Sequence, residues 1–138
     1  AGVTDTAALN WGLEGPDPEK ALSGLSKDIT KLMLSHRPSL APESAKAGAS
    51  LQLSGHTHGG LILPVTPLIA AFHGGQLFGV NQIVGWFNDG FLAGTYHPGR
   101  TLLYVSPGSG LWTGFPLRLF VPSEITLITL TGTGFDTN

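Results

Sequence analysis

Two histidines separated by one residue stand in a glycine-flanked segment, residues 55–60 (GHTHGG). Neutral imidazole binds zinc, manganese, iron, cobalt and nickel, so His56 and His58 are candidate metal ligands. On an extended strand the two rings would point to opposite faces. The flanking glycines permit positive φ angles, which would let a turn direct both rings into one pocket. For this motif taken alone, a histidine-containing surface loop is the alternative interpretation.

A third histidine, His36, follows the apolar segment 31–35 (KLMLS), which has the composition of a short buried strand. A second strand is predicted over residues 50–54, directly before the GHTHGG turn. In a parallel sheet the carboxyl ends of neighbouring strands meet at one edge, which places His36 beside His56 and His58. Three histidines can also hold a single zinc ion, so their number leaves one metal and two metals open.

Arg37 follows His36 and is a candidate for binding an anionic group of a substrate. The planar guanidinium matches the spacing of phosphate oxygens. An ordinary surface charge is the alternative interpretation for this arginine.

The elements that must position these residues follow an α/β order. A helix is predicted from Asp17 and another over residues 42–48, alternating with the two strands. Residues 61–88 are apolar and irregular. Three further strands are predicted over residues 90–96, 101–106 and 124–131, the first two joined as an antiparallel hairpin by residues 97–100 (HPGR).

The composition limits the functions that are open. The chain has 138 residues, a net charge of −2 and no cysteine, which fits one domain without disulfides or thiolate metal sites. Only 12% of residues are charged, and residues 47–88 contain no Asp, Glu, Lys or Arg. This excludes a coiled coil and gives no nucleic-acid-binding surface. The absence of cysteine leaves the compartment open.

Taken together, SHRP at residues 35–38 and LSGHTHGG at residues 53–60 resemble the last two signature blocks of the calcineurin-like metallophosphoesterases. The tail is similar as well, in FLAGTY (91–96), LYVSPG (103–108) and the segment from Leu117 to Thr126. The similarity is to the membrane-associated bacterial subgroup of the family and extends from about Lys31 to Leu130.

This resemblance implies an α/β fold that is the C-terminal half of a four-layer α/β/β/α sandwich with a mixed sheet. It implies a hydrolase with two divalent or trivalent metal ions (Zn, Mn, Fe, Co or Ni), His36 and His56 binding one and His58 the other. A metal-activated water would attack the phosphorus of a phosphomonoester, phosphodiester or pyrophosphate. It also implies contact with a membrane surface, with a membrane-associated or cell-envelope location favoured and the cytoplasm possible.

The sequence departs from the family pattern in two ways. The earlier blocks D-x-H, G-D and G-N-H-[DE] are absent, and Leu61 stands where the family tends to have glutamine. We therefore expect residues 1–138 to be the C-terminal part of one domain, whose partner is the N-terminal half carrying the remaining ligands. Alone, this chain is expected to hydrolyse phosphoesters poorly.

Two other interpretations are open. The chain could be a non-catalytic fragment or degenerate paralogue that binds a partner or a membrane. It could also be a mononuclear zinc enzyme complete in itself, although no carboxylate lies near the histidines in sequence.

Overall fold

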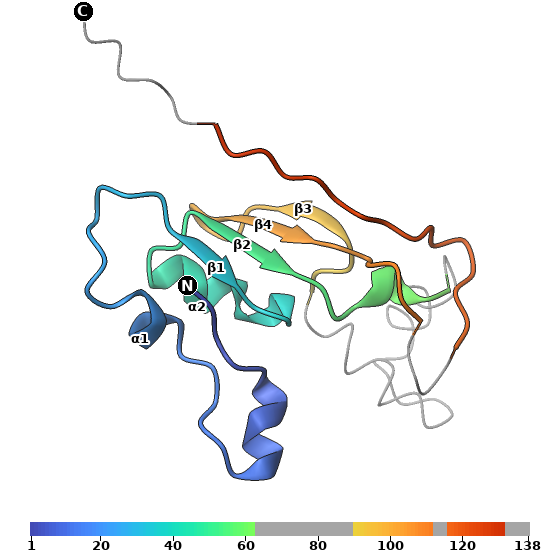
Figure 1. The fold of residues 1–138 in the computed structure, drawn as a ribbon, viewed down its shortest axis with the longest axis horizontal. Helices are drawn as coiled ribbons and strands as arrows, with labels where there is room; N and C mark the ends of the chain where they lie inside the picture. The colour runs from blue at the N-terminus through green and yellow to red at the C-terminus, as the bar shows by residue number, and fades with distance from the viewer. Residues whose placement is uncertain (63–89, 112–115, 132–138) are drawn as a thin grey trace, which may run out of the picture.

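The computed structural model of the chain describes residues 1–62, 90–111 and 116–131. Within these ranges four short strands form one mixed sheet in the order β1-β2-β4-β3. The strands are β1 (Leu32–Leu34), β2 (Leu51–Ser54), β3 (Gly94–Tyr96) and β4 (Leu102–Val105). Figure 1 shows them side by side, with the helices α1 (Pro18–Leu22) and α2 (Ala41–Lys46) next to the sheet.

The sheet confirms the parallel pairing of β1 with β2 and the hairpin that the sequence predicts, and it adds a parallel pairing of β2 with β4 that the sequence did not predict. β1 pairs with β2 and β2 with β4, both in parallel, while β3 and β4 form the predicted antiparallel hairpin. A further edge is provided by residues 1–3, since Gly2 bridges Leu34 in parallel. The described part of the chain thus has a mixed sheet that is compatible with an α/β fold.

Helix α1 begins where local capping rules place it. Asp17 caps α1 by accepting a hydrogen bond from the Lys20 N–H, and Pro18 occupies the first turn. The 3-10 turn η2 (Pro38–Leu40) follows Arg37 and leads directly into α2. These short connections bring the chain from the end of β1 to the start of β2.

One face of the sheet carries the core. Met33, Leu103 and Val105 are fully buried and belong to two clusters: Met33 packs with Leu22 of α1, and the other two with Ala41 of α2. Strand residues alternate between faces, so the intervening side chains lie on the opposite face. There Leu34 and Leu102 are 51% and 38% exposed.

The predicted strand at residues 124–131 was wrong, because these residues form no strand. Their β-branched sequence suits a strand, but no ladder partner lies beside them in the described part of the chain, and Ile125 and Leu127 are 93% and 92% exposed. In Figure 1 this segment runs as an extended trace. Tyr104 of β4 holds its beginning, through hydrogen bonds to Glu124 and Thr126.

The irregular segment predicted over residues 61–88 lies, from residue 63 on, outside the described residues. The described part contains one sheet, which is compatible with an α/β fold and leaves the four-layer sandwich an expectation. Within that part, none of the helices has the length and apolar character needed to cross a membrane.

Candidate metal centre

The ends of β1 and β2 bring two of the predicted ligands together. Backbone hydrogen bonds continue past both strands, from the Ser35 N–H to the Leu53 carbonyl and from the Gly55 N–H to the His36 carbonyl. As a result His36 Nε2 and His56 Nδ1 lie 3.3 Å apart. The two rings meet edge to face, with centroids 5.0 Å apart. We call His36 and His56 the histidine pair.

The turn that carries His56 and His58 has an unusual backbone. Positive φ angles occur at Gly59 and Gly60, as the sequence indicated, but also at both histidines, with φ of 72° at His56 and 49° at His58. Non-glycine residues rarely adopt this region, and where they do the strain tends to be functional. Thr57 between them is buried and donates a hydrogen bond of 2.5 Å to the Leu92 carbonyl, which anchors the turn.

His58 lies apart from the histidine pair. Its Nδ1 is 3.3 Å from the carbonyl oxygen of Gly110. Across residues 1–62, 90–111 and 116–131, no three His, Asp or Glu side chains are close enough together to hold one metal ion. The structure thus brings His36 and His56 into contact and leaves His58 at a neighbouring position in the same turn.

Electrostatics keep His56 neutral near physiological pH. Burial lowers the pKa of His56 to about 4, and the nearby charges of Arg37 and His36 act in the same direction. Asp5 opposes them. A neutral imidazole keeps a nitrogen lone pair that protonation would remove, and this is the form that binds metal ions.

Asp5 is a residue near the site that sequence reasoning did not identify. Its Oδ1 accepts a hydrogen bond of 3.0 Å from Arg37 Nε, across 32 positions of the chain. Burial acts to raise the pKa of Asp5, but the Ala7 N–H and the Arg37 guanidinium lower it overall. Backbone hydrogen bonds of residues 1–3 to β1, with an isolated bridge at Gly2, bring this carboxylate close, and so short a pairing leaves no clear pattern in the sequence.

The histidine pair fits a tetrahedral metal ion in one measurable respect. Two nitrogens bound at about 2.0–2.1 Å to such an ion lie roughly 3.3–3.4 Å apart. The observed separation of 3.3 Å between His36 Nε2 and His56 Nδ1 agrees with that value. The spacing of the two nitrogens is therefore suitable for sharing one ion.

The GHTHGG turn is supported by residues that follow β4. A Cβ atom on Gly59 would lie 2.6 Å from Val121 Cγ1, so only glycine fits there. Arg118 holds this support together by donating to the carbonyls of Pro107 and Gly108. The role of Arg118 within the described part is thus structural.

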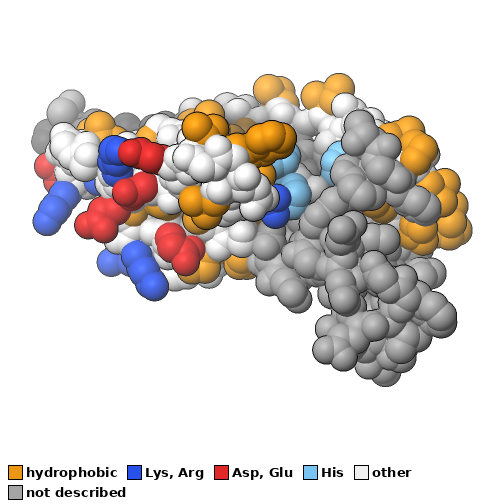
Figure 2. Space-filling view, turned by 90° about the horizontal axis from the view of Figure 1, so that it is seen from below, with side chains coloured by type: hydrophobic (Ala, Val, Ile, Leu, Met, Phe, Trp, Pro, Cys, Tyr) orange, Lys and Arg blue, Asp and Glu red, His pale blue; other side chains and the backbone are white. Residues whose placement is uncertain are grey.

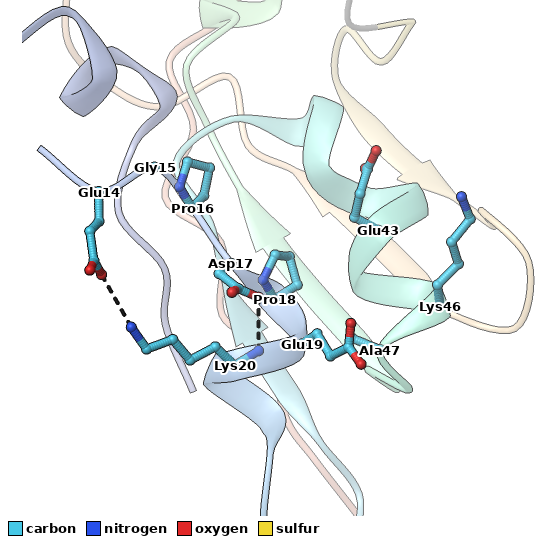
Figure 3. Close-up of a pocket in the computed structure, with 10 residues that line it drawn as sticks. All are labelled: Glu14, Gly15, Pro16, Asp17, Pro18, Glu19, Lys20, Glu43, Lys46 and Ala47. Carbon is cyan, nitrogen blue, oxygen red and sulfur yellow. Dashed lines mark hydrogen bonds and ion pairs between the residues drawn. The ribbon is translucent and has the colours of Figure 1, made fainter. Parts of the chain in front are cut away.

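On the face shown in Figure 2, the visible histidine side chains lie apart from the visible acidic side chains, which gather toward the left of the view. A cavity of about 420 Å³, lined in part by Leu34, His36 and Gly55, adjoins the histidine pair. A larger cavity of about 780 Å³ lies between residues 14–20 on one side and helix α2 on the other (Figure 3). Its charged lining includes the ion pair of Lys20 with Glu14 and contains none of the candidate ligands.

Comparison with known proteins gives a consistent result. The chain is 37% identical over 133 residues to an uncharacterised metallophosphoesterase of Campylobacter jejuni, and 37% identical over 123 residues to one of Bacillus subtilis. It is also 37% identical over 135 residues to a bovine transmembrane protein with a metallophosphoesterase domain. The chain is a homologue of the metallophosphoesterases. The resemblance found in the sequence is confirmed.

The three matches cover 96%, 88% and 94% of this chain but only 31%, 38% and 27% of the respective relatives. The chain therefore spans about a third of the length of these metallophosphoesterases, and it matches their C-terminal part. No family model and no solved structure matches it.

Proposed function

We propose that this chain is the C-terminal part of a metal-dependent phosphoesterase and supplies histidine ligands to its metal centre. The observation that carries the proposal is the histidine pair at the carboxyl ends of two neighbouring parallel strands. In open α/β sheets this edge is where ligands bind. Homology to metallophosphoesterases gives the reaction class.

In this proposal His36 and His56 hold one metal ion and His58 holds a second. The 3.3 Å spacing of the pair and the lowered pKa of His56 support the first assignment. The separate position of His58 beside the Gly110 carbonyl is compatible with a different ion. Bound metal ions would supply an activated water and stabilise charge on the phosphoryl oxygens.

Arg37 is proposed to bind the substrate's phosphoryl oxygens. It follows His36 directly, and its side chain is 25% exposed, so part of it can be reached from solvent. It lies close enough to His56 to lower the pKa of that ring. An arginine beside the metal ligands would add a planar donor for the transferred group.

The partner proposed for this chain is the N-terminal half of the same enzyme. Exposed apolar side chains support this partner. Leu34 and Leu102 are partly exposed on the sheet face opposite the helices, and Ile125 and Leu127 are exposed in the extended segment 124–131. A carboxylate ligand from that half would complete the set of donors that the histidines begin. Peripheral contact with a membrane is a further role for exposed apolar side chains in this proposal.

Cobalt binding tests the histidine assignment in the isolated chain. Titration with Co²⁺, followed by visible absorption, is expected to give a saturable signal from imidazole-bound metal. Replacing His36 or His56 with alanine should weaken binding by at least about tenfold, and His58→Ala should weaken it less. His97→Ala is the matched control, since His97 is exposed in the hairpin turn.

The non-catalytic alternative makes the opposite prediction. A fragment that serves only to bind a partner or a membrane has no use for the histidine pair as ligands. If His36→Ala and His56→Ala bind Co²⁺ as tightly as His97→Ala, the metal assignment is wrong and the alternative is favoured.

A further inference from the structure

The Asp5–Arg37 ion pair sits beside the proposed metal site without containing any of its ligands. Arg37 Nε donates to Asp5 Oδ1 at 3.0 Å, and the two side chains are only 25% and 27% exposed. A pair shielded to this degree holds its geometry better than a surface pair such as Lys20–Glu14, whose side chains are 71% and 88% exposed.

Asp5 is itself held firmly. It caps the 3-10 helix η1 (Thr6–Trp11), and its Oδ1 accepts a hydrogen bond of 2.7 Å from the Ala7 N–H. Residues 1–3 are fixed along β1, with the Leu34 N–H bonded to the Ala1 carbonyl and the Val3 N–H to the Leu34 carbonyl. The carboxylate therefore approaches Arg37 from a rigid part of the sheet edge.

The Arg37 backbone is fixed as well. Its carbonyl accepts a hydrogen bond of 2.9 Å from Ser35 Oγ and a longer one from the buried Gln52 side chain. With the backbone and Nε both held, the guanidinium plane has one orientation. Within the described ranges Nη1 and Nη2 make no hydrogen bond, so both remain available as donors.

We propose that Asp5 is a positioning residue that orients the Arg37 guanidinium, so that its two terminal nitrogens bind a phosphate-type oxyanion beside the histidine pair. The ligand class rests on the proposed function. The positioning itself rests on the ion pair and its anchors. Of the three guanidinium nitrogens of Arg37, only Nε donates a hydrogen bond to Asp5. The two terminal nitrogens, Nη1 and Nη2, are therefore left to make a bidentate contact with the oxyanion.

The negative charge of Asp5 and its positioning of Arg37 have opposite effects on phosphate affinity, so the two roles can be separated by experiment. Asp5 partly neutralises Arg37, so a counterion role alone would make its removal strengthen phosphate binding. Asp5→Ala and Asp5→Asn remove the same charge, but asparagine keeps an oxygen that can accept from Arg37 Nε and from the Ala7 N–H. Any difference between these two variants therefore reports on positioning.

The test is a titration of the metal-free chain with inorganic phosphate in EDTA, followed by NMR at the backbone amide of residue 37, which every variant retains. We expect saturable binding, with Asp5→Ala weaker than Asp5→Asn by about tenfold, the size of one charge-assisted hydrogen bond. In an Arg37→Lys background the two variants should bind phosphate equally. Glu14→Ala, which removes a carboxylate from the other ion pair, should show the affinity of the unaltered chain.

Three results would overturn the proposal: no phosphate binding by the unaltered chain, equal affinity of Asp5→Ala and Asp5→Asn, or a difference that persists with Arg37→Lys. None of them bears on the metal assignment, because the titration contains no metal and the cobalt experiment is separate. If Asp5→Ala unfolds, Asp5→Ser replaces it in the comparison with Asp5→Asn. Serine is also uncharged and can cap η1, but its shorter side chain does not reach Arg37 Nε, so Asp5→Ser should bind phosphate more weakly than Asp5→Asn.

Discussion

At the scale of single residues, the site depends on a histidine whose environment disfavours its charged form. His56 has a positive φ, and burial together with the nearby charges of Arg37 and His36 lowers its pKa. Because the ring is packed in the turn, it has lost part of its conformational freedom before any ligand binds. Binding a metal ion would then require little rearrangement of this side chain.

The pKa of His56 makes the stability of the metal-free chain depend on pH. The folded-state pKa is about 4 against an ordinary value of 6.5, so the unfolded chain binds more protons between these values. The contribution of the neutral ring is complete above about pH 6.5 and is lost as the pH falls toward 4. Urea unfolding in EDTA at several pH values measures this slope.

His56→Gln should flatten the slope, because glutamine does not titrate. His97→Gln removes an exposed histidine and should leave it unchanged. Equal slopes for His56→Gln and the unaltered chain would show that His56 titrates normally.

At the scale of elements, β2 and the GHTHGG turn act as one unit that Pro107 and Val121 support. The predicted order of helix and strand was confirmed through β4, because apolar runs, a capping aspartate and a Pro-Gly turn are local signals. The juxtaposition of His36 and His56 was also predictable, since it follows from parallel pairing alone. Asp5 was not, because its approach depends on a pairing that the sequence does not mark.

The strand expected at residues 124–131 shows the limit of such signals. Its residues have high strand propensity, but a strand also needs a neighbour that satisfies its backbone groups. Tyr104 contacts its first residues through side chains, which holds the segment near the sheet without pairing it. The strand propensity of residues 124–131 predicted a strand, but within the described ranges no neighbouring strand pairs with them, and they form none.

Gly59→Ala is predicted to disturb the turn through a steric clash. The new Cβ would lie 2.6 Å from Val121 Cγ1 and 3.0 Å from Pro107 Cβ, at a φ of +63°. We expect a loss of about 2–4 kcal/mol in the free energy of unfolding, from backbone strain and overpacking together. Chemical denaturation measures it.

Gly12→Ala is the matched control, since Gly12 has a similar φ of +69° and a Cβ added there would meet no atom within 4 Å. It should cost only the strain component, about 1 kcal/mol. If both substitutions lower the free energy of unfolding by the same amount, Val121 and Pro107 move aside at no cost and do not support the GHTHGG turn rigidly.

At the scale of the whole molecule, helices α1 and α2 cover one face of the sheet, and within the described residues the opposite face is partly exposed. Helices α1 and α2 bury Met33 and Leu103, while Leu34 and Leu102 expose apolar surface on the opposite face. The chain spans about a third of the length of its relatives, and the histidine pair lies at one edge of its sheet. Our proposal therefore assigns phosphoesterase activity to the chain joined with the N-terminal half, and not to the chain alone.

The most direct measurement of this claim is metal-dependent phosphatase activity after the N-terminal part of a relative is joined to the chain. The chain would be joined to the segment that precedes the matched region in the Campylobacter jejuni relative. Hydrolysis of p-nitrophenyl phosphate and bis-p-nitrophenyl phosphate would be followed with Mn²⁺ or Zn²⁺ present. The account predicts turnover by the joined protein, little by the isolated chain, a loss with His36→Ala or His56→Ala, and none with His97→Ala. Turnover by the isolated chain at the joined protein's rate, or a folded joined protein no more active than its His36→Ala variant, would contradict it.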